Sequence, residues 1–206
     1  MTAEVKYGTD IANMGDLDGD GVIDIAVGAD EDSSNGTDKG AVYIHYLNSD
    51  GSLKEDTVKI RHGTTNGPDI TYSGGYGNSV ENIGDFDGDG VNDMAVGEMN
   101  KGGGNYKGYL HIHFMNANGS IKSTVEIDGD NASHMPGDRV GPYYTFFGSA
   151  IANIGDQDRD GVNDLAVGAS MNFNDTATAE IYTFEGVLSK DVVHILNMHA
   201  DRPVKQ

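Results

Sequence analysis

The sequence contains no cysteine and no tryptophan, and only four of its 206 residues are proline. The absence of cysteine excludes a disulfide framework, thiolate zinc sites and a cysteine nucleophile. No apolar run approaches the roughly 18 residues that a transmembrane helix needs. The N-terminal residues 1–6 also lack the apolar core of a secretory signal peptide. We therefore expect no membrane insertion, and a chain that is either intracellular as written or cut from a longer precursor.

Basic residues are also scarce, since 13 Lys and Arg stand against 33 Asp and Glu, which gives a formal net charge of −20. A chain of this kind lacks the basic face that binds nucleic acid. An anionic membrane surface would repel it as well. An excess of carboxylates on this scale either faces solvent or binds cations, and the spacing of the aspartates decides between the two.

Three copies of one pattern fill the chain. Each copy opens with an aromatic residue and a glycine, and an aspartate-rich loop follows. The first aspartates of the three loops, Asp16, Asp85 and Asp156, recur after 69 and 71 residues. Repeats of this length indicate a repeat architecture. We predict a single domain, or a fragment of one, over residues 1–206, with repeats at about 7–75, 76–146 and 147–206.

Each repeat is predicted to form four short β-strands, the first directly after the aromatic–glycine pair. The second strand is expected at 24–28, 93–97 and 164–168, the third at 41–47, 109–115 and 180–184, and the fourth at 57–60, 124–127 and 192–195. Gly51 and Gly119 lie in hairpin turns, where a positive φ is expected. No 3.6-residue apolar period is sustained, so helices are not expected.

Four short antiparallel strands, repeated along a chain, are typical of β-propeller blades. The fold class predicted from the sequence is therefore all-β, with three four-stranded blades. The small residues of the second strand, such as Ala26 and Gly28, suit a strand near a crowded central axis.

The aspartate-rich loops join the first and second strands of each repeat. Carboxylates occupy positions 1, 3, 5 and 9, glycine occupies position 6, and the valine at position 7 can offer its backbone carbonyl. Calcium takes about 6–8 oxygen ligands in flexible geometry, and four carboxylates so close together would repel one another without a cation. We predict three calcium ions per chain. The expected ligands are Asp16, Asp18, Asp20, Val22 and Asp24; Asp85, Asp87, Asp89, Val91 and Asp93; and Asp156, Asp158, Asp160, Val162 and Asp164.

Other interpretations of the loops are weaker. An EF-hand needs flanking helices and a glutamate at position 12, but that position holds Val27, Val96 and Val167 within predicted strands. Magnesium demands near-octahedral geometry at about 2.0–2.1 Å. A solvated acidic turn would explain one copy of the loop, whereas three copies at matching positions favour calcium.

His111 and His113 alternate along a predicted strand, as a pair of metal ligands could. The corresponding residues are Tyr43 and His45 in the first repeat, and Tyr182 and Phe184 in the third. Replacement by aromatic residues favours a role in packing or on a surface over a zinc site.

The repeats resemble the FG-GAP repeat of integrin α-subunit propellers and of many bacterial surface proteins. Phe147-Gly148 is the Phe-Gly element, and Tyr-Gly stands in its place in the other repeats. Gly28-Ala29-Asp30 retains part of the Gly-Ala-Pro element. The calcium loop matches three times, except that Arg159 replaces the usual glycine at position 4, which supplies no ligand. The resemblance implies a propeller whose calcium ions rigidify the loops.

The resemblance also implies a non-enzymatic function. We expect an adhesion or protein-interaction module that is extracellular or at a cell surface, with a protein or glycan ligand and no catalytic residues. One alternative is an accessory domain of a calcium-dependent extracellular enzyme, such as a hydrolase or a lyase. Another is a purely structural repeat of a giant surface protein, which would lack a ligand.

The number of blades departs from the family. The resemblance implies seven blades, as in integrin propellers, and propellers close with about 4–8 blades. Three blades would leave two bare sheet edges. The chain is therefore expected to be a fragment or to close by association, and a homodimer would supply six blades.

Overall fold

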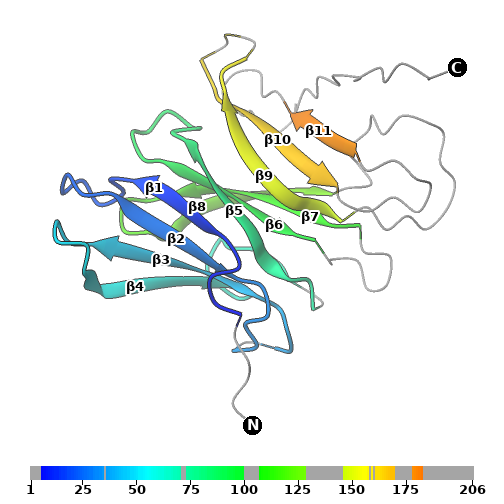
Figure 1. Cartoon of the computed structure of the whole chain (residues 1–206), viewed down its shortest axis with the longest axis horizontal. Coiled ribbons are helices and arrows are strands. Elements are labelled where there is room, and N and C mark those ends of the chain that lie inside the picture. Colours follow the sequence, from blue (N-terminus) through cyan, green and yellow to red (C-terminus); the bar gives the residue numbers. More distant parts are fainter. Residues whose placement is uncertain are drawn as a thin grey trace, which may run out of the picture.

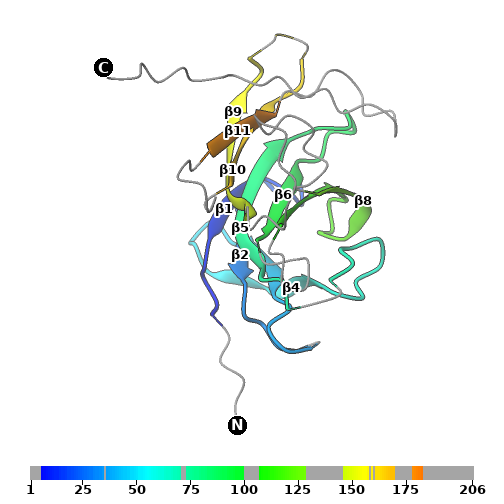
Figure 2. The ribbon, with the colours of Figure 1, turned by 90° about the vertical axis from the view of Figure 1, so that its right-hand side faces the viewer.

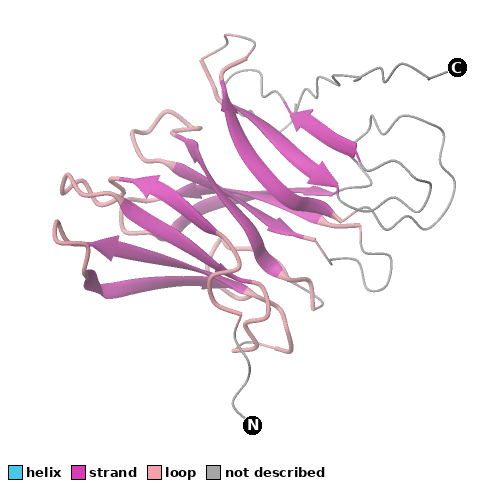
Figure 3. Ribbon diagram, viewed as in Figure 1, coloured by secondary structure: helices cyan, strands magenta, loops and turns pink. Residues whose placement is uncertain are grey.

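The computed structural model describes residues 6–34, 36–70, 73–99, 107–128, 146–157, 159, 161–169 and 178–182. These residues form strands and loops, and no helix occurs among them (Figure 3). Accordingly, the described part of the chain contains no helix that could cross a membrane. The strands are β1 (Ile11–Gly15), β2 (Asp24–Ala29), β3 (Ala41–Leu47), β4 (Leu53–Arg61), β5 (Tyr76–Gly84), β6 (Asp93–Glu98), β7 (Tyr109–Met115), β8 (Ile121–Asp128), β9 (Phe147–Gly155), β10 (Asp164–Ala169) and β11 (Thr178–Tyr182).

The strands form three antiparallel sheets in which sequential strands are neighbours. Strands β1–β4 form blade 1, β5–β8 form blade 2, and β9–β11 form the described part of blade 3. Figure 1 shows the blades in chain order, from blue through green to orange, and Figure 2 shows the same succession from the side. β5 lies against β1 and β2, and β9 lies against β5 and β6. The predicted all-β fold of propeller-type blades is confirmed.

The predicted second and third strands of blades 1 and 2 agree with the structure to within one residue. The fourth strands are longer than predicted, because β4 and β8 begin directly after the hairpin turns. Gly51 and Gly119 have φ values of +81° and +71°, as the turns required. β11 begins two residues before the predicted 180–184. The predicted strand at 192–195 lies outside the described residues.

The hydrophobic core lies between neighbouring blades. One cluster joins residues of blades 1 and 2, among them Met14, Ile44 and Tyr76, and a second joins blades 2 and 3 through Ile83 and Phe147. Valine and isoleucine fill strands that are buried on both faces, which is the usual pattern for such strands. Each blade therefore depends on its neighbour for burial of its apolar side chains.

Glycines allow the blades to approach closely. A Cβ at Gly28 would lie 2.0 Å from the carbonyl oxygen of Gly77 in blade 2, and a Cβ at Gly97 would lie 2.0 Å from that of Gly148 in blade 3. We expected these small residues to be crowded by a central axis, but the close contacts at Gly28 and Gly97 come from the backbone of the next blade. Only a residue without a side chain permits this approach.

Asparagine side chains add hydrogen bonds between the blades. Asn82 Nδ2 donates to the carbonyl of Asn13 at 2.9 Å, and Asn153 Nδ2 donates to the carbonyl of Asn82 at 3.0 Å. A second series joins Asn92 Nδ2 to the carbonyl of Met14 at 2.9 Å. Its counterpart joins Asn163 Nδ2 to the carbonyl of Ile83 at 3.0 Å. The same interface is thus built twice within the chain.

Candidate calcium-binding loops

The three aspartate-rich loops connect β1 to β2, β5 to β6 and β9 to β10. Position 6 of each loop has a positive φ, between +89° and +96°, which explains the glycine there. Position 4 is also left-handed, with φ of +80° at Gly19, +77° at Gly88 and +70° at Arg159. Arg159 therefore occupies a conformation that favours glycine, which its role as a non-ligand did not predict.

Two of the loops gather carboxylates closely enough to share one cation. Oxygens of Asp16, Asp18 and Asp24 lie within 4.8 Å of one another, as do oxygens of Asp85, Asp87 and Asp89. In the third loop, Asp156 and Asp164 are described, whereas Asp158 and Asp160 lie outside the described residues. The structure thus brings together six of the predicted ligands in two groups.

The aspartate at position 1 folds each loop back on itself. Asp16 Oδ2 accepts a hydrogen bond from the Gly21 amide at 2.8 Å. Asp85 Oδ2 accepts the corresponding bond from Gly90 at 2.8 Å. In the third loop, Asp156 accepts from Gly161 at 2.9 Å. The repeated bond holds the first carboxylate at the mouth of the turn, where the other carboxylates meet.

The aspartate at position 9 is fully buried and ties the loop to the sheet. Asp93 accepts hydrogen bonds from the Phe86 and Met115 amides, each at 2.8 Å. Asp24 makes the equivalent bonds to Leu17 and Leu47, each at 3.0 Å. Burial raises the pKa of Asp93 to about 6. The sequence predicted this residue as a ligand, and the structure adds its role as a structural tether.

A lysine from the fourth strand reaches each of the first two loops. Lys54 Nζ lies 2.5 Å from Asp18 and 2.6 Å from Asp20. Lys122 Nζ lies 2.7 Å from Asp87 and also contacts Asp89. The hydrogen bond from Lys54 lowers the pKa of Asp20. These carboxylate pairs therefore already attract a positive charge.

The two lysines were not predicted as partners of the acidic loops. Lys54 and Lys122 occupy the same position, directly after the first residue of β4 and of β8. Each is more than 30 residues from the aspartates that it contacts. Strand pairing brings them together, and sequence spacing gives no indication of it.

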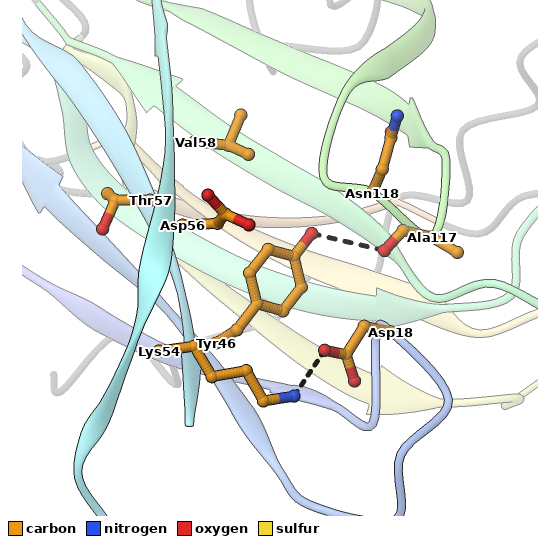
Figure 4. Close-up of a pocket in the computed structure, with 8 residues that line it drawn as sticks. All are labelled: Asp18, Tyr46, Lys54, Asp56, Thr57, Val58, Ala117 and Asn118. Atoms are coloured by element: carbon orange, nitrogen blue, oxygen red, sulfur yellow. Dashed lines mark hydrogen bonds and ion pairs between the residues drawn. The ribbon is translucent and has the colours of Figure 1, made fainter. Parts of the chain in front are cut away.

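A shallow groove of about 600 Å³ lies beside the first loop (Figure 4). Tyr46 lies at its centre and donates a hydrogen bond from its hydroxyl to the Ala117 carbonyl in blade 2, at 3.2 Å. Burial raises the pKa of Tyr46 to about 12. The groove is lined by Asp18, Tyr46, Lys54, Asp56, Thr57, Val58, Ala117 and Asn118.

The histidines of β7 are part of the packing. His111 and His113 are fully buried, and their rings stack at 5.9 Å. His113 bonds to the Tyr76 hydroxyl and to Thr124, each at 2.8 Å, and His111 bonds to Glu98 at 2.8 Å. The packing interpretation of these residues is confirmed.

Comparisons with known proteins identify the same repeat. A family model described as the FG-GAP repeat matches residues 8–45. Integrin alpha-6 of Gallus gallus is 36% identical over 165 residues, which cover 80% of this chain and 13% of the relative. Integrin alpha-11 of Homo sapiens is 30% identical over 167 residues, covering 81% of the chain and 13% of the relative. Integrin alpha-4 of Xenopus laevis is 29% identical over 157 residues, covering 76% and 14%.

The chain spans only about one seventh of the length of these relatives. The match nevertheless extends over most of the chain and includes the first acidic loop. The resemblance inferred from the repeats is confirmed, because residues 8–45 match the FG-GAP repeat and most of the chain is similar to integrin α subunits.

Proposed function

We propose that this chain is a calcium-binding FG-GAP module that serves adhesion or protein interaction at a cell surface and catalyses no reaction. The observation that carries the calcium part is the grouping of three carboxylates in each of two loops. Within the second group, Asp87 Oδ1 is buried and has no hydrogen-bond partner among the residues that the structure describes. A buried carboxylate oxygen without a partner is costly, and a bound cation would satisfy it. The donor set consists of oxygen atoms, as calcium prefers.

The residues that would hold the ions are the aspartates at positions 1, 3, 5 and 9, with the backbone carbonyl at position 7. Each loop ends in a buried aspartate that is bonded to the sheet, as Asp93 is to Met115. A cation in the loop would therefore fasten the connection between the first two strands of a blade. Three divalent ions would also reduce the formal net charge from −20 to −14.

The adhesive part of the proposal rests on the relatives, which are integrin α subunits by name. By the same argument we place the chain outside the cell or at its surface, with a protein or glycan as ligand. Binding to arrayed glycans or matrix proteins that a chelator reverses would support this part. Turnover of a glycan or ester that a chelator abolishes would instead favour a calcium-dependent enzyme.

Calorimetric titration with calcium tests the metal sites. We expect about three ions per chain, and about two after Asp20→Ala, Asp89→Ala or Asp160→Ala, because each change removes a carboxylate at position 5. Asp69→Ala is the control, since that side chain is 79% exposed and lies outside the loops. Binding that is absent from the unsubstituted chain, or lost equally in the control, would refute the calcium sites.

A second titration tests the competing lysine. Lys54→Met is expected to tighten calcium binding at the first loop by about 2–5-fold, because an exposed lysine that pairs with the loop carboxylates competes only weakly with the ion. Lys59→Met removes the same charge from the same strand, but Lys59 pairs with Asp32 rather than with the loop. Equal effects of the two substitutions would show that net charge, and not competition within the loop, sets the affinity.

A further inference from the structure

Blade 1 exposes apolar residues that blades 2 and 3 bury. We define the incoming face of a blade as the side that packs on the preceding blade. On this face of blade 1, Tyr7 is 52% and Ile11 is 61% exposed. The corresponding Tyr76 and Phe147 are fully buried, and Val80 is 2% exposed. The incoming face of blade 1 is therefore built like a covered face, but no described residue covers it.

The opposite side of blade 3 shows the complementary feature. We define the outgoing face of a blade as the side that packs on the next blade. On blade 3 this face carries Ile154, which is half-exposed, whereas the corresponding Met14 and Ile83 are buried. Among the described residues, a Cβ at Gly168 would meet no atom closer than 3.4 Å, in contrast to the 2.0 Å found at Gly28 and Gly97. Blade 3 thus retains a glycine at the close-approach position, with nothing described against it.

Two positions at which blades 1 and 3 differ from the interface between blades 1 and 2 make these two faces complementary. Between blades 1 and 2, the Met14 carbonyl accepts a hydrogen bond from Asn92 of the next blade. In blade 3 the equivalent carbonyl, that of Ile154, accepts instead from Gln157 of its own loop. In blade 1 the position of Asn92 holds Ile23, which is 53% exposed and donates no such bond. The Ile154 carbonyl on the outgoing face of blade 3 already has a donor within its own loop. It therefore needs none from blade 1, where Ile23 cannot supply one.

The other inter-blade hydrogen bond keeps its donor. Asn82 and Asn153 each accept from a glycine amide two residues ahead, at 2.8 and 3.0 Å, and each directs Nδ2 to the preceding blade. Asn13 makes the same local bond to Gly15 at 2.8 Å, so its amide group is oriented in the same way. No acceptor for Asn13 Nδ2 is found among the described residues.

We propose that two copies of this chain associate head to tail, with the incoming face of each on the outgoing face of the other. Asn13 Nδ2 then donates to the Asn153 carbonyl of the second copy, and the Gly8 carbonyl lies against Gly168. Two such contacts close a ring of six blades and leave neither face exposed, as a closed symmetric assembly requires. This contact depends on the packing between blades and does not require bound calcium.

Light scattering coupled to size exclusion tests the proposal in calcium-containing buffer. The unsubstituted chain is expected at twice its mass of 21.8 kDa. Ile11→Glu should give a monomer, because it places a charge on the incoming face. Asp69→Ala is the control, since Asp69 is 79% exposed and lies beside β8 of the middle blade, and this variant should stay dimeric. If the unsubstituted chain is a folded monomer, the proposal is overturned. That result would be expected if another polypeptide, and not a second copy, covers these faces.

Mixing two variants tests the head-to-tail arrangement. Gly168→Ala should also give a folded monomer, because its Cβ is tolerated within the chain but would meet the incoming carbonyl. Mixed with Ile11→Glu, it should form a heterodimer, because the outgoing face of one variant and the incoming face of the other are both intact. A dimer that survives Gly168→Ala, or variants that remain monomeric when mixed, would exclude this geometry. Circular dichroism establishes that each variant is folded.

Discussion

Gly28→Ala is expected to lower the free energy of unfolding by about 3 kcal/mol, at the upper end of the range for overpacked cores. Its Cβ would lie 2.0 Å from the Gly77 carbonyl oxygen. Gly28 lies in β2 and Gly77 in β5, and both strands are held by pairing within their sheets, so neither backbone can shift freely to relieve the contact. Gly168→Ala makes the same chemical change at the corresponding position of blade 3, where the nearest described atom lies at 3.4 Å. The free energy of unfolding of that variant should lie within about 0.5 kcal/mol of the value for its parent, as is usual for substitutions away from such contacts.

Chemical denaturation measures both variants. Each is made in the Ile11→Glu background, so that loss of dimerisation does not enter the comparison. The inter-blade account requires a large difference between the two glycines. Equal destabilisation would mean that the cost comes from the glycine-to-alanine change within a strand, and not from the neighbouring blade.

Removal of calcium is expected to lower the melting temperature by about 10 °C for each site that is lost. Binding to the native state alone contributes about 4 kcal/mol at a free ion concentration near 1,000 times Kd, and 1 kcal/mol corresponds to roughly 2–4 °C in a chain of this size. Without the ion, Lys54 and Lys122 compensate only part of the loop charge, because each contacts two carboxylates.

Differential scanning calorimetry with calcium, with a chelator, and after calcium is restored measures this effect. Restoration with excess magnesium is the control, and it should recover little of the stability because magnesium favours a stricter octahedral geometry. A melting temperature that is unchanged by the chelator would mean that the loops contribute nothing to stability through a bound ion.

The strands could be predicted where apolar residues alternate with polar ones along the sequence or form a continuous short run. Asp24–Ala29 and Asp93–Glu98 carry short apolar runs between turn residues, and both were located to within one residue. β4 was predicted too short, because Lys54, Glu55 and Asp56 make its first half read as a loop. A strand at the outer edge of a blade needs few apolar side chains. The first residue of such a strand is therefore hard to predict from the pattern of polar and apolar residues.

The loops were predictable because their ligand chemistry is local in sequence. Their surroundings were not, because these depend on pairing between distant segments. Lys54 contacts Asp18 across 36 residues, and Asn92 contacts Met14 across 78. The left-handed conformation of Arg159 was not predicted for a different reason, because arginine, unlike glycine, does not indicate a positive φ.

Anomalous diffraction from crystals grown with calcium tests the central claim most directly. We expect one strong peak within each acidic loop, surrounded by aspartate oxygens, with the ammonium groups of Lys54 and Lys122 turned away from the carboxylates. Loops without any peak, with Lys54 still on Asp18 and Asp20 and Lys122 still on Asp87 and Asp89, would contradict calcium binding by this chain.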